Sequence, residues 1–173
     1  ISPQFASSNV DLPALPAEVY KLVEDKRLYA VMDIGGDDRG AYALGRYVPY
    51  LLEEGDYQMA FVANPCRPLT ATPEQALEVM GEIQAACGLP FTAIVNNANL
   101  AYETTIHTVL NALPYMKELS ALSGLPVWFT AAEERVAEVL AGWVPDVLPM
   151  RLQEKYFDLP EQRGPPKPRP LFG

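Results

Sequence analysis

Short apolar runs alternate with amphipathic stretches along most of the chain. The runs are too apolar to face water and too short to form helices, which is typical of strands buried on both faces of a parallel sheet. They predict strands at residues 28–32, 58–63, 91–95 and 126–129. Polar or turn-forming residues follow each run, so each predicted strand has a recognisable end.

The stretches between these runs have the spacing of amphipathic helices. The clearest is residues 73–87, where Thr72 caps the helix, Gln75 completes a capping box and Gly88 ends it. A second capping box, at residues 130–133, predicts that a helix begins directly after the fourth run. The other helices are expected at residues 16–25, 39–47, 49–54, 103–111 and 114–123.

This alternation of strands and helices predicts an α/β fold, with a parallel, helix-covered sheet connected by right-handed crossovers. A chain of 173 residues is long enough for one such domain with its own core. We assign residues 1–150 to the domain. Residues 151–173 become rich in proline with polar spacers, so we expect an extended or disordered C-terminal extension.

Composition narrows the classes of partner. The formal net charge of −9 opposes nucleic-acid binding, which needs a basic surface. No apolar stretch approaches the length of a membrane-spanning helix, so we expect no membrane partner. Cys66 and Cys87 lie far apart without a C-x-x-C motif, which fits a reduced, cytoplasmic protein. With His107 as the single histidine, a zinc or iron–sulfur site is not expected.

Three of the predicted strands end in residues that suit ligand binding. Since the carboxyl ends of parallel strands share one edge of a sheet, these ends should converge there, where open α/β folds bind ligands. Asp33 and Gly36 fit an Asp-x-x-Gly turn, in which the acid orients magnesium and the glycine N–H approaches a terminal phosphate. The simpler alternative is that Asp33 caps the next helix and that the asparagines at residues 96–99 only make a turn after their strand. The three ends are Asp33-Ile34-Gly35-Gly36, Asn96-Asn97-Ala98-Asn99 and Thr130-Ala131-Ala132.

These motifs resemble the second half of a MinD/ParA-type P-loop ATPase domain, of the CobQ/CobB/MinD/ParA group, over residues 9–140. One matching segment corresponds to the Walker B strand and switch II, and the other corresponds to the base-binding strand end. They read Val31-Met32-Asp33-Ile34-Gly35-Gly36 and Ile94-Val95-Asn96-Asn97. The resemblance implies a three-layer P-loop fold, with helices on both faces of the parallel sheet.

The resemblance also implies roles for individual residues. Asp33 would hold Mg²⁺ through water and Gly36 would sense the γ-phosphate of ATP, while Asp37 and Asp38 would lie on the switch. Asn96 or Asn97 would hydrogen-bond adenine. The remaining cofactor-binding residues, from the next strand end, would be Thr130 and Ala131. ATP and Mg²⁺ are the expected cofactors.

One part of the family pattern is missing. No Gly-x-x-x-x-Gly-Lys-Ser/Thr segment occurs, and no glycine is followed by lysine. In the family this phosphate loop lies on the first strand and helix, ahead of the matched region. The resemblance therefore implies that the first strand and the phosphate loop precede Ile1, and that this chain alone binds nucleotide poorly and hydrolyses none.

Two functions remain open from the sequence. The first is a nucleotide switch or ATPase domain of MinD/ParA type, coupled to a homodimer or a protein partner. The second is a non-catalytic α/β interaction module that kept the fold and lost nucleotide chemistry.

Overall fold

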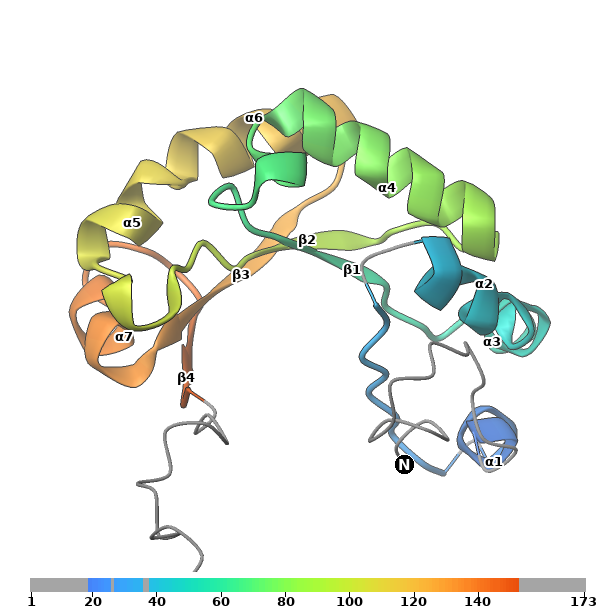
Figure 1. Ribbon diagram of the computed structural model, residues 1–173. Helices are drawn as coiled ribbons and strands as arrows, with labels where there is room; N and C mark the ends of the chain where they lie inside the picture. The colour runs from blue at the N-terminus through green and yellow to red at the C-terminus, as the bar shows by residue number, and fades with distance from the viewer. Residues whose placement is uncertain (1–18, 26, 36–37, 153–173) are drawn as a thin grey trace, which may run out of the picture.

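The structure is a computed structural model that describes residues 19–25, 27–35 and 38–152. Its centre is a four-stranded parallel sheet in the order β1-β2-β3-β4 (Figure 1). The strands are β1 (Ala60–Ala63), β2 (Ala93–Asn96), β3 (Val127–Glu133) and β4 (Val147–Met150). The first three coincide with predicted apolar runs, so the expectation of a parallel α/β fold is confirmed. The sequence did not predict β4.

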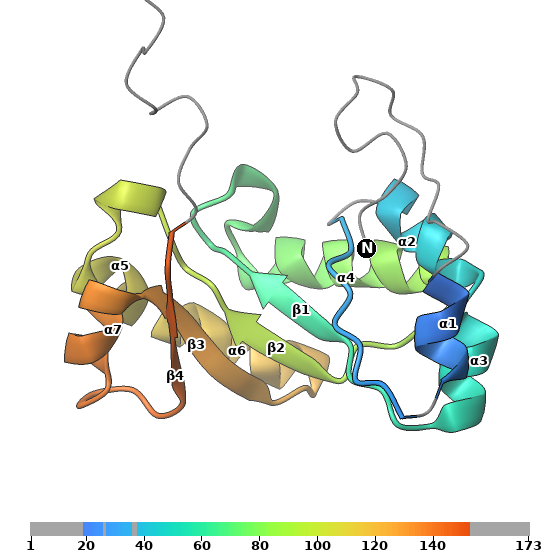
Figure 2. The same cartoon turned by 90° about the horizontal axis from the view of Figure 1, so that it is seen from below.

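The crossover helices lie on one face of the sheet. α4 (Pro73–Cys87) joins β1 to β2, and α7 (Glu134–Leu140) joins β3 to β4. Between β2 and β3 lie α5 (Ile106–Asn111) and α6 (Leu113–Ser123). Right-handed connections between parallel strands in sequential order must all run on the same side. Figure 2 looks onto the other face, where no helix of the described ranges covers the strands. The expected second helical layer therefore remains a prediction.

Three further helices lie beyond the β1 end of the sheet. They are α1 (Val19–Glu24), α2 (Asp38–Gly45) and α3 (Val48–Glu54). α2 packs along α4, and its buried Ala41 and Leu44 join a core cluster that also takes residues from β1, β2 and α6. A smaller cluster lies between α5, α7 and the end of β3. Within the described part of the chain, every helix is too short or too polar to traverse a lipid bilayer.

The α4 helix forms as its local sequence predicts. The Thr72 hydroxyl accepts a hydrogen bond from the Gln75 N–H, and the Gln75 side chain accepts one from the Thr72 N–H. Gly88 follows the last helical residue with φ 76°, a left-handed conformation that suits glycine. Both ends of the helix therefore satisfy their own backbone groups.

The predicted strand at residues 28–32 is wrong. In the structure the 27–35 segment runs beside β1 and in the same direction (Figure 2), but it pairs with no described strand. Tyr29 and Val31 are fully exposed, whereas Met32 and Ile34 pack against the core cluster. An apolar run becomes a strand only when a neighbouring strand satisfies its backbone groups. Among the described residues, no strand forms hydrogen-bonded pairs with this segment on either side.

The predicted capping box at residues 130–133 is also wrong. These residues continue β3 to Glu133, and α7 begins at Glu134 without a side-chain cap. The reason is β4, which pairs with β3 from Thr130 to Glu133 and keeps these residues extended. A tertiary partner has overridden a local helix signal.

Tyr115 ties α6 to η1 (Pro68–Thr70), the short helix that follows β1. Its hydroxyl donates a hydrogen bond to the carbonyl of Thr70, with an O···O distance of 2.9 Å. Burial, together with the negative charge of Glu74, raises the pKa of Tyr115 from 10.0 to about 12. The folded protein thus favours the neutral phenol.

This environment predicts a pH-dependent effect of Tyr115→Phe. At neutral pH the variant should lose about 1 kcal/mol of unfolding free energy, because the hydrogen bond to Thr70 is lost. The unfolded chain ionises Tyr115 near pH 10 and the folded protein only near pH 12. The stability of the wild-type protein is therefore complete below pH 10 and falls as the pH rises from 10 to about 12. The deficit of the variant should therefore shrink above pH 10 in urea unfolding, with the exposed Tyr42→Phe as control. A deficit that grows with pH would contradict this assignment.

Candidate functional site

The carboxyl ends of the strands lie at one edge of the sheet because all four strands are parallel. Two of the residues predicted from the sequence meet there directly. Asn96 ends β2 and is paired with Thr130 of β3, and the Asn96 Nδ2 donates to the Thr130 Oγ1 at 3.4 Å. Ala131 follows in β3 and is buried. Asn96 at the end of β2 is thus brought together with Thr130, although Thr130 lies inside β3 and not at its end as the sequence predicted.

The two adjacent asparagines differ in what their side chains can reach. Asn96 is fully buried, and its Oδ1 accepts a hydrogen bond from the Ala98 N–H at 3.2 Å. With Thr130 on its Nδ2, both ends of this amide are engaged inside the protein. Asn97 is only half-buried, and its backbone N–H bonds to the carbonyl of Ala63 in β1. Of the two, Asn97 is the residue that is partly exposed to solvent.

A third asparagine, Asn64, links the loops that follow β1 and β2. Its Nδ2 donates to the Asn99 carbonyl at 3.1 Å, and its Oδ1 accepts from the Asn99 N–H at 3.4 Å. The same oxygen accepts from the Cys66 N–H at 3.0 Å. Asn64 is not among the residues that the sequence singled out as candidates. Its position directly after an apolar run was the signal that could have identified it.

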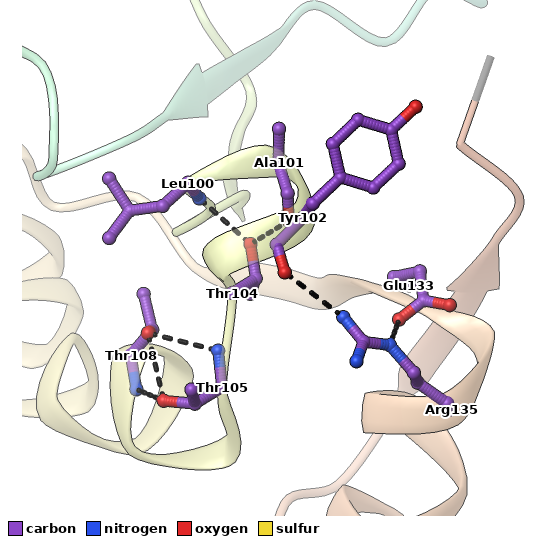
Figure 3. Close-up of polar contacts among 8 residues, drawn as sticks. All are labelled: Leu100, Ala101, Tyr102, Thr104, Thr105, Thr108, Glu133 and Arg135. Carbon is purple, nitrogen blue, oxygen red and sulfur yellow. Dashed lines mark hydrogen bonds and ion pairs between the residues drawn. The ribbon is translucent and has the colours of Figure 1, made fainter. Parts of the chain in front are cut away.

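In the loop after β2, the Thr104 side chain bonds back to the backbone of the preceding residues. The Thr104 hydroxyl accepts from the Leu100 N–H at 2.8 Å and donates to the Ala101 carbonyl at 2.7 Å (Figure 3). Thr104 is buried, and Ala101 has φ 52°, a left-handed conformation that costs about 1 kcal/mol without glycine. The hydroxyl contacts hold the turn in this conformation. The loop therefore has a fixed shape at the edge of the sheet.

Arg135 connects this loop to the start of α7. Its guanidinium forms an ion pair with Glu133 and donates through Nη2 to the Tyr102 carbonyl at 3.3 Å (Figure 3). The arginine side chain remains 62% exposed, so it also presents positive charge to solvent. Arg135 was not singled out for this role from the sequence, because its contact with Tyr102 joins residues that are far apart in the chain.

The residues that the sequence predicts beside phosphate are only partly described. Asp33 is exposed on the 27–35 segment, and Gly35 lies against Gly40 of α2. Gly36 and Asp37 lie outside the described residues, and so does the side chain of Asp38, the first residue of α2. The predicted meeting of Asp33 with the other two strand ends therefore stays a prediction.

The strand-end residues offer hydrogen bonding and the partly exposed guanidinium of Arg135. Amides, hydroxyls and backbone groups of this kind recognise polar ligands such as a heterocyclic base. Within the described ranges, no three His, Cys, Asp or Glu side chains are grouped so that they could hold a metal ion. A single carboxylate such as Asp33, acting through water, is a different kind of site and is compatible with how Mg²⁺ is held beside phosphates.

No protein-family model matches the chain, and no curated protein or solved structure is similar enough to count as a match.

Proposed function

We propose that the chain is the C-terminal part of a nucleotide switch or ATPase domain of MinD/ParA type that uses ATP and Mg²⁺. The observation that carries the proposal is the parallel sheet whose carboxyl edge gathers the asparagine ends of β1 and β2 and the threonine of β3. In open α/β sheets, ligands bind outside this edge. The alternative of an interaction module lacks an observation that favours it.

In this proposal Asn97 contacts the adenine, because this residue is partly exposed while Asn96 is committed to internal hydrogen bonds. Asn96 and Thr130 act as positioning residues that hold the two strand ends in register. The fixed loop from Leu100 to Thr104 would form one wall beside the base. Substitution of Asn97 should therefore weaken ATP binding, whereas substitution of the neighbouring Asn96 should lower stability.

On the phosphate side, Asp33 would hold Mg²⁺ through water, and Mg²⁺ would supply charge neutralisation for attack of water on the γ-phosphate. The segment that would grip the phosphates is not among these residues, since the chain has no phosphate-loop motif. We therefore propose that the 173-residue chain alone binds ATP weakly and does not hydrolyse it.

The test is a titration with a fluorescent ATP analogue, with and without Mg²⁺, of this chain and of the gene product that includes the coding sequence upstream of Ile1. The longer protein should bind with clear Mg²⁺ dependence and this chain at least tenfold more weakly. In the longer protein, Asn97→Ala should weaken binding by about tenfold without lowering the melting temperature, which is the effect of one lost hydrogen bond in a desolvated site. Asp33→Asn should remove most of the Mg²⁺ dependence.

Asn111→Ala is the matched control, because Asn111 is an exposed asparagine at the end of α5. Unchanged, Mg²⁺-dependent binding in both Asp33→Asn and Asn97→Ala would overturn the site. An initiator methionine just before Ile1, together with no ATP binding, would instead favour the interaction module.

A further inference from the structure

Four asparagines lie at the carboxyl edge of the sheet, at the ends of β1 and β2. Asn64 follows β1, whereas Asn96, Asn97 and Asn99 end or follow β2. Asn64, Asn96 and Asn99 each have both the donor and the acceptor of the side-chain amide in hydrogen bonds within the protein. Within the described part of the chain, no hydrogen bond engages the side chain of Asn97. The group therefore leaves one amide, that of Asn97, uncommitted.

Asn99 holds the backbone of Asn97 in place. The Asn99 Nδ2 donates to the Asn97 carbonyl at 2.9 Å, and the Asn97 N–H donates to the carbonyl of Ala63 in the same loop region at 2.9 Å. Both backbone groups of Asn97 are therefore fixed, one by β1 and the other by Asn99. The Asn99 Oδ1 accepts from the Ala101 N–H at 3.4 Å, so the Asn99 side chain spans the turn and is not free for a ligand.

Asn64 holds Asn99 from the neighbouring loop. Its side-chain amide bonds to the backbone of Asn99 twice, as a donor at 3.1 Å and as an acceptor at 3.4 Å. Asn64 is itself anchored, because its carbonyl accepts from the Thr70 hydroxyl at 2.8 Å and its Oδ1 accepts from the Cys66 N–H at 3.0 Å. Supporting hydrogen bonds of this kind fix the geometry of a binding group. The position of Asn97 thus depends on a residue that follows another strand.

We propose that Asn64 is a positioning residue for the ligand contact of Asn97, acting through Asn99. The inference rests on the proposed function, which assigns the contact with the base to Asn97. A single amide contributes most to affinity when it is already held where the polar edge of the ligand will lie, because otherwise binding must first order it. Asn64 supplies this order while its own amide stays bonded to the backbone of the protein.

The first test measures binding of the fluorescent ATP analogue to the longer protein. Asn64→Ala should weaken binding by about fivefold, less than Asn97→Ala does, because the binding group is still present but is no longer held in place. The double variant should bind no more weakly than Asn97→Ala alone, since Asn64 acts only through Asn97. A further loss in the double variant, or unchanged binding in Asn64→Ala, would overturn the proposal.

Two further variants separate positioning from folding. Asn64→Asp has the shape of the native residue and keeps the acceptor for the Cys66 N–H, but it places an oxygen against the Asn99 carbonyl. It should weaken binding as Asn64→Ala does. Cys66→Ser keeps the backbone contact with Asn64 and should leave binding unchanged. If both Asn64 variants lower the melting temperature and the folded protein keeps its affinity, Asn64 is structural and the proposal fails.

Amide hydrogen exchange on the 173-residue chain, without nucleotide, tests the same contact independently of ATP. In Asn64→Ala the Asn99 N–H loses its acceptor, and the Asn97 N–H should also exchange at least about threefold faster, while Ile94 in the centre of β2 keeps its rate. Unchanged exchange at Asn97 would overturn the proposal. Faster exchange without ATP binding by the longer protein would refute only the proposed function. ATP binding that depends on Asn97 but not on Asn64 would refute only the positioning role.

Discussion

Gly40→Ala is expected to destabilise the fold, whereas Gly81→Ala is expected to stabilise it. A Cβ at Gly40 would lie 2.8 Å from the carbonyl oxygen of Gly35 and 3.0 Å from its nitrogen. These are backbone atoms, so the contact is relieved only by moving α2 or the 27–35 segment. Forced displacement of this kind costs about 1–3 kcal/mol, from which about 0.5–1 kcal/mol of improved helix propensity is subtracted.

Gly81 is the matched control for this prediction. It lies exposed in the middle of α4, and nothing lies within 4 Å of a Cβ built there. Alanine at that position should therefore add about 0.5–1 kcal/mol through helix propensity alone. Thermal unfolding should move the two variants in opposite directions, by about 2–4 °C for each kcal/mol in a chain of this size. Equal stabilisation by both substitutions would show that Gly35 is not held against α2.

Asn96→Leu should cost more than any surface substitution at the same edge. It removes the acceptor of the buried Ala98 N–H and the partner of the Thr130 hydroxyl. Each buried polar group left without a partner costs about 1–3 kcal/mol, so we expect a total loss of about 2–4 kcal/mol. Asn97→Leu, one residue further along and half-buried, should change the unfolding free energy much less.

A double-mutant cycle with Thr130→Val separates the two lost contacts. If the Thr130 hydroxyl is orphaned by Asn96→Leu, replacing it by a methyl group should recover part of that loss. The cost of the double variant should then be smaller than the sum of the two single costs, as measured by urea unfolding. Strict additivity would show that the Asn96–Thr130 hydrogen bond contributes nothing to stability.

The parts of the fold that sequence predicted are those whose signals are local. α4 carries its cap, its first-turn proline and its terminal glycine within its own sequence, and all of them are used. The strand at residues 28–32 and the helix start at residues 130–133 had equally good local patterns. Both predictions failed because strand pairing depends on residues far away in the chain. No described strand pairs with residues 28–32, whereas β4 pairs with residues 130–133 and keeps them extended.

The same distinction applies to the candidate site. Asn96, Asn97 and Thr130 were found because they immediately follow or interrupt apolar runs, and parallel topology brings such positions together. The contacts of Asn64 with Asn99 and of Arg135 with Tyr102 join separate loops. No spacing in the sequence encodes them. The burial of Asn96 beside a half-exposed Asn97 likewise depends on β3 covering one of the two.

Pro149 makes the β4 edge of the sheet less able than the β1 edge to pair with a strand of another molecule. The carbonyl of Asp146 bonds to the Thr130 N–H, so by alternation Pro149 turns its backbone nitrogen away from β3. That nitrogen has no hydrogen to offer an incoming chain. Among the strands that the structure describes, intermolecular β-pairing is therefore expected at β1 and not at β4.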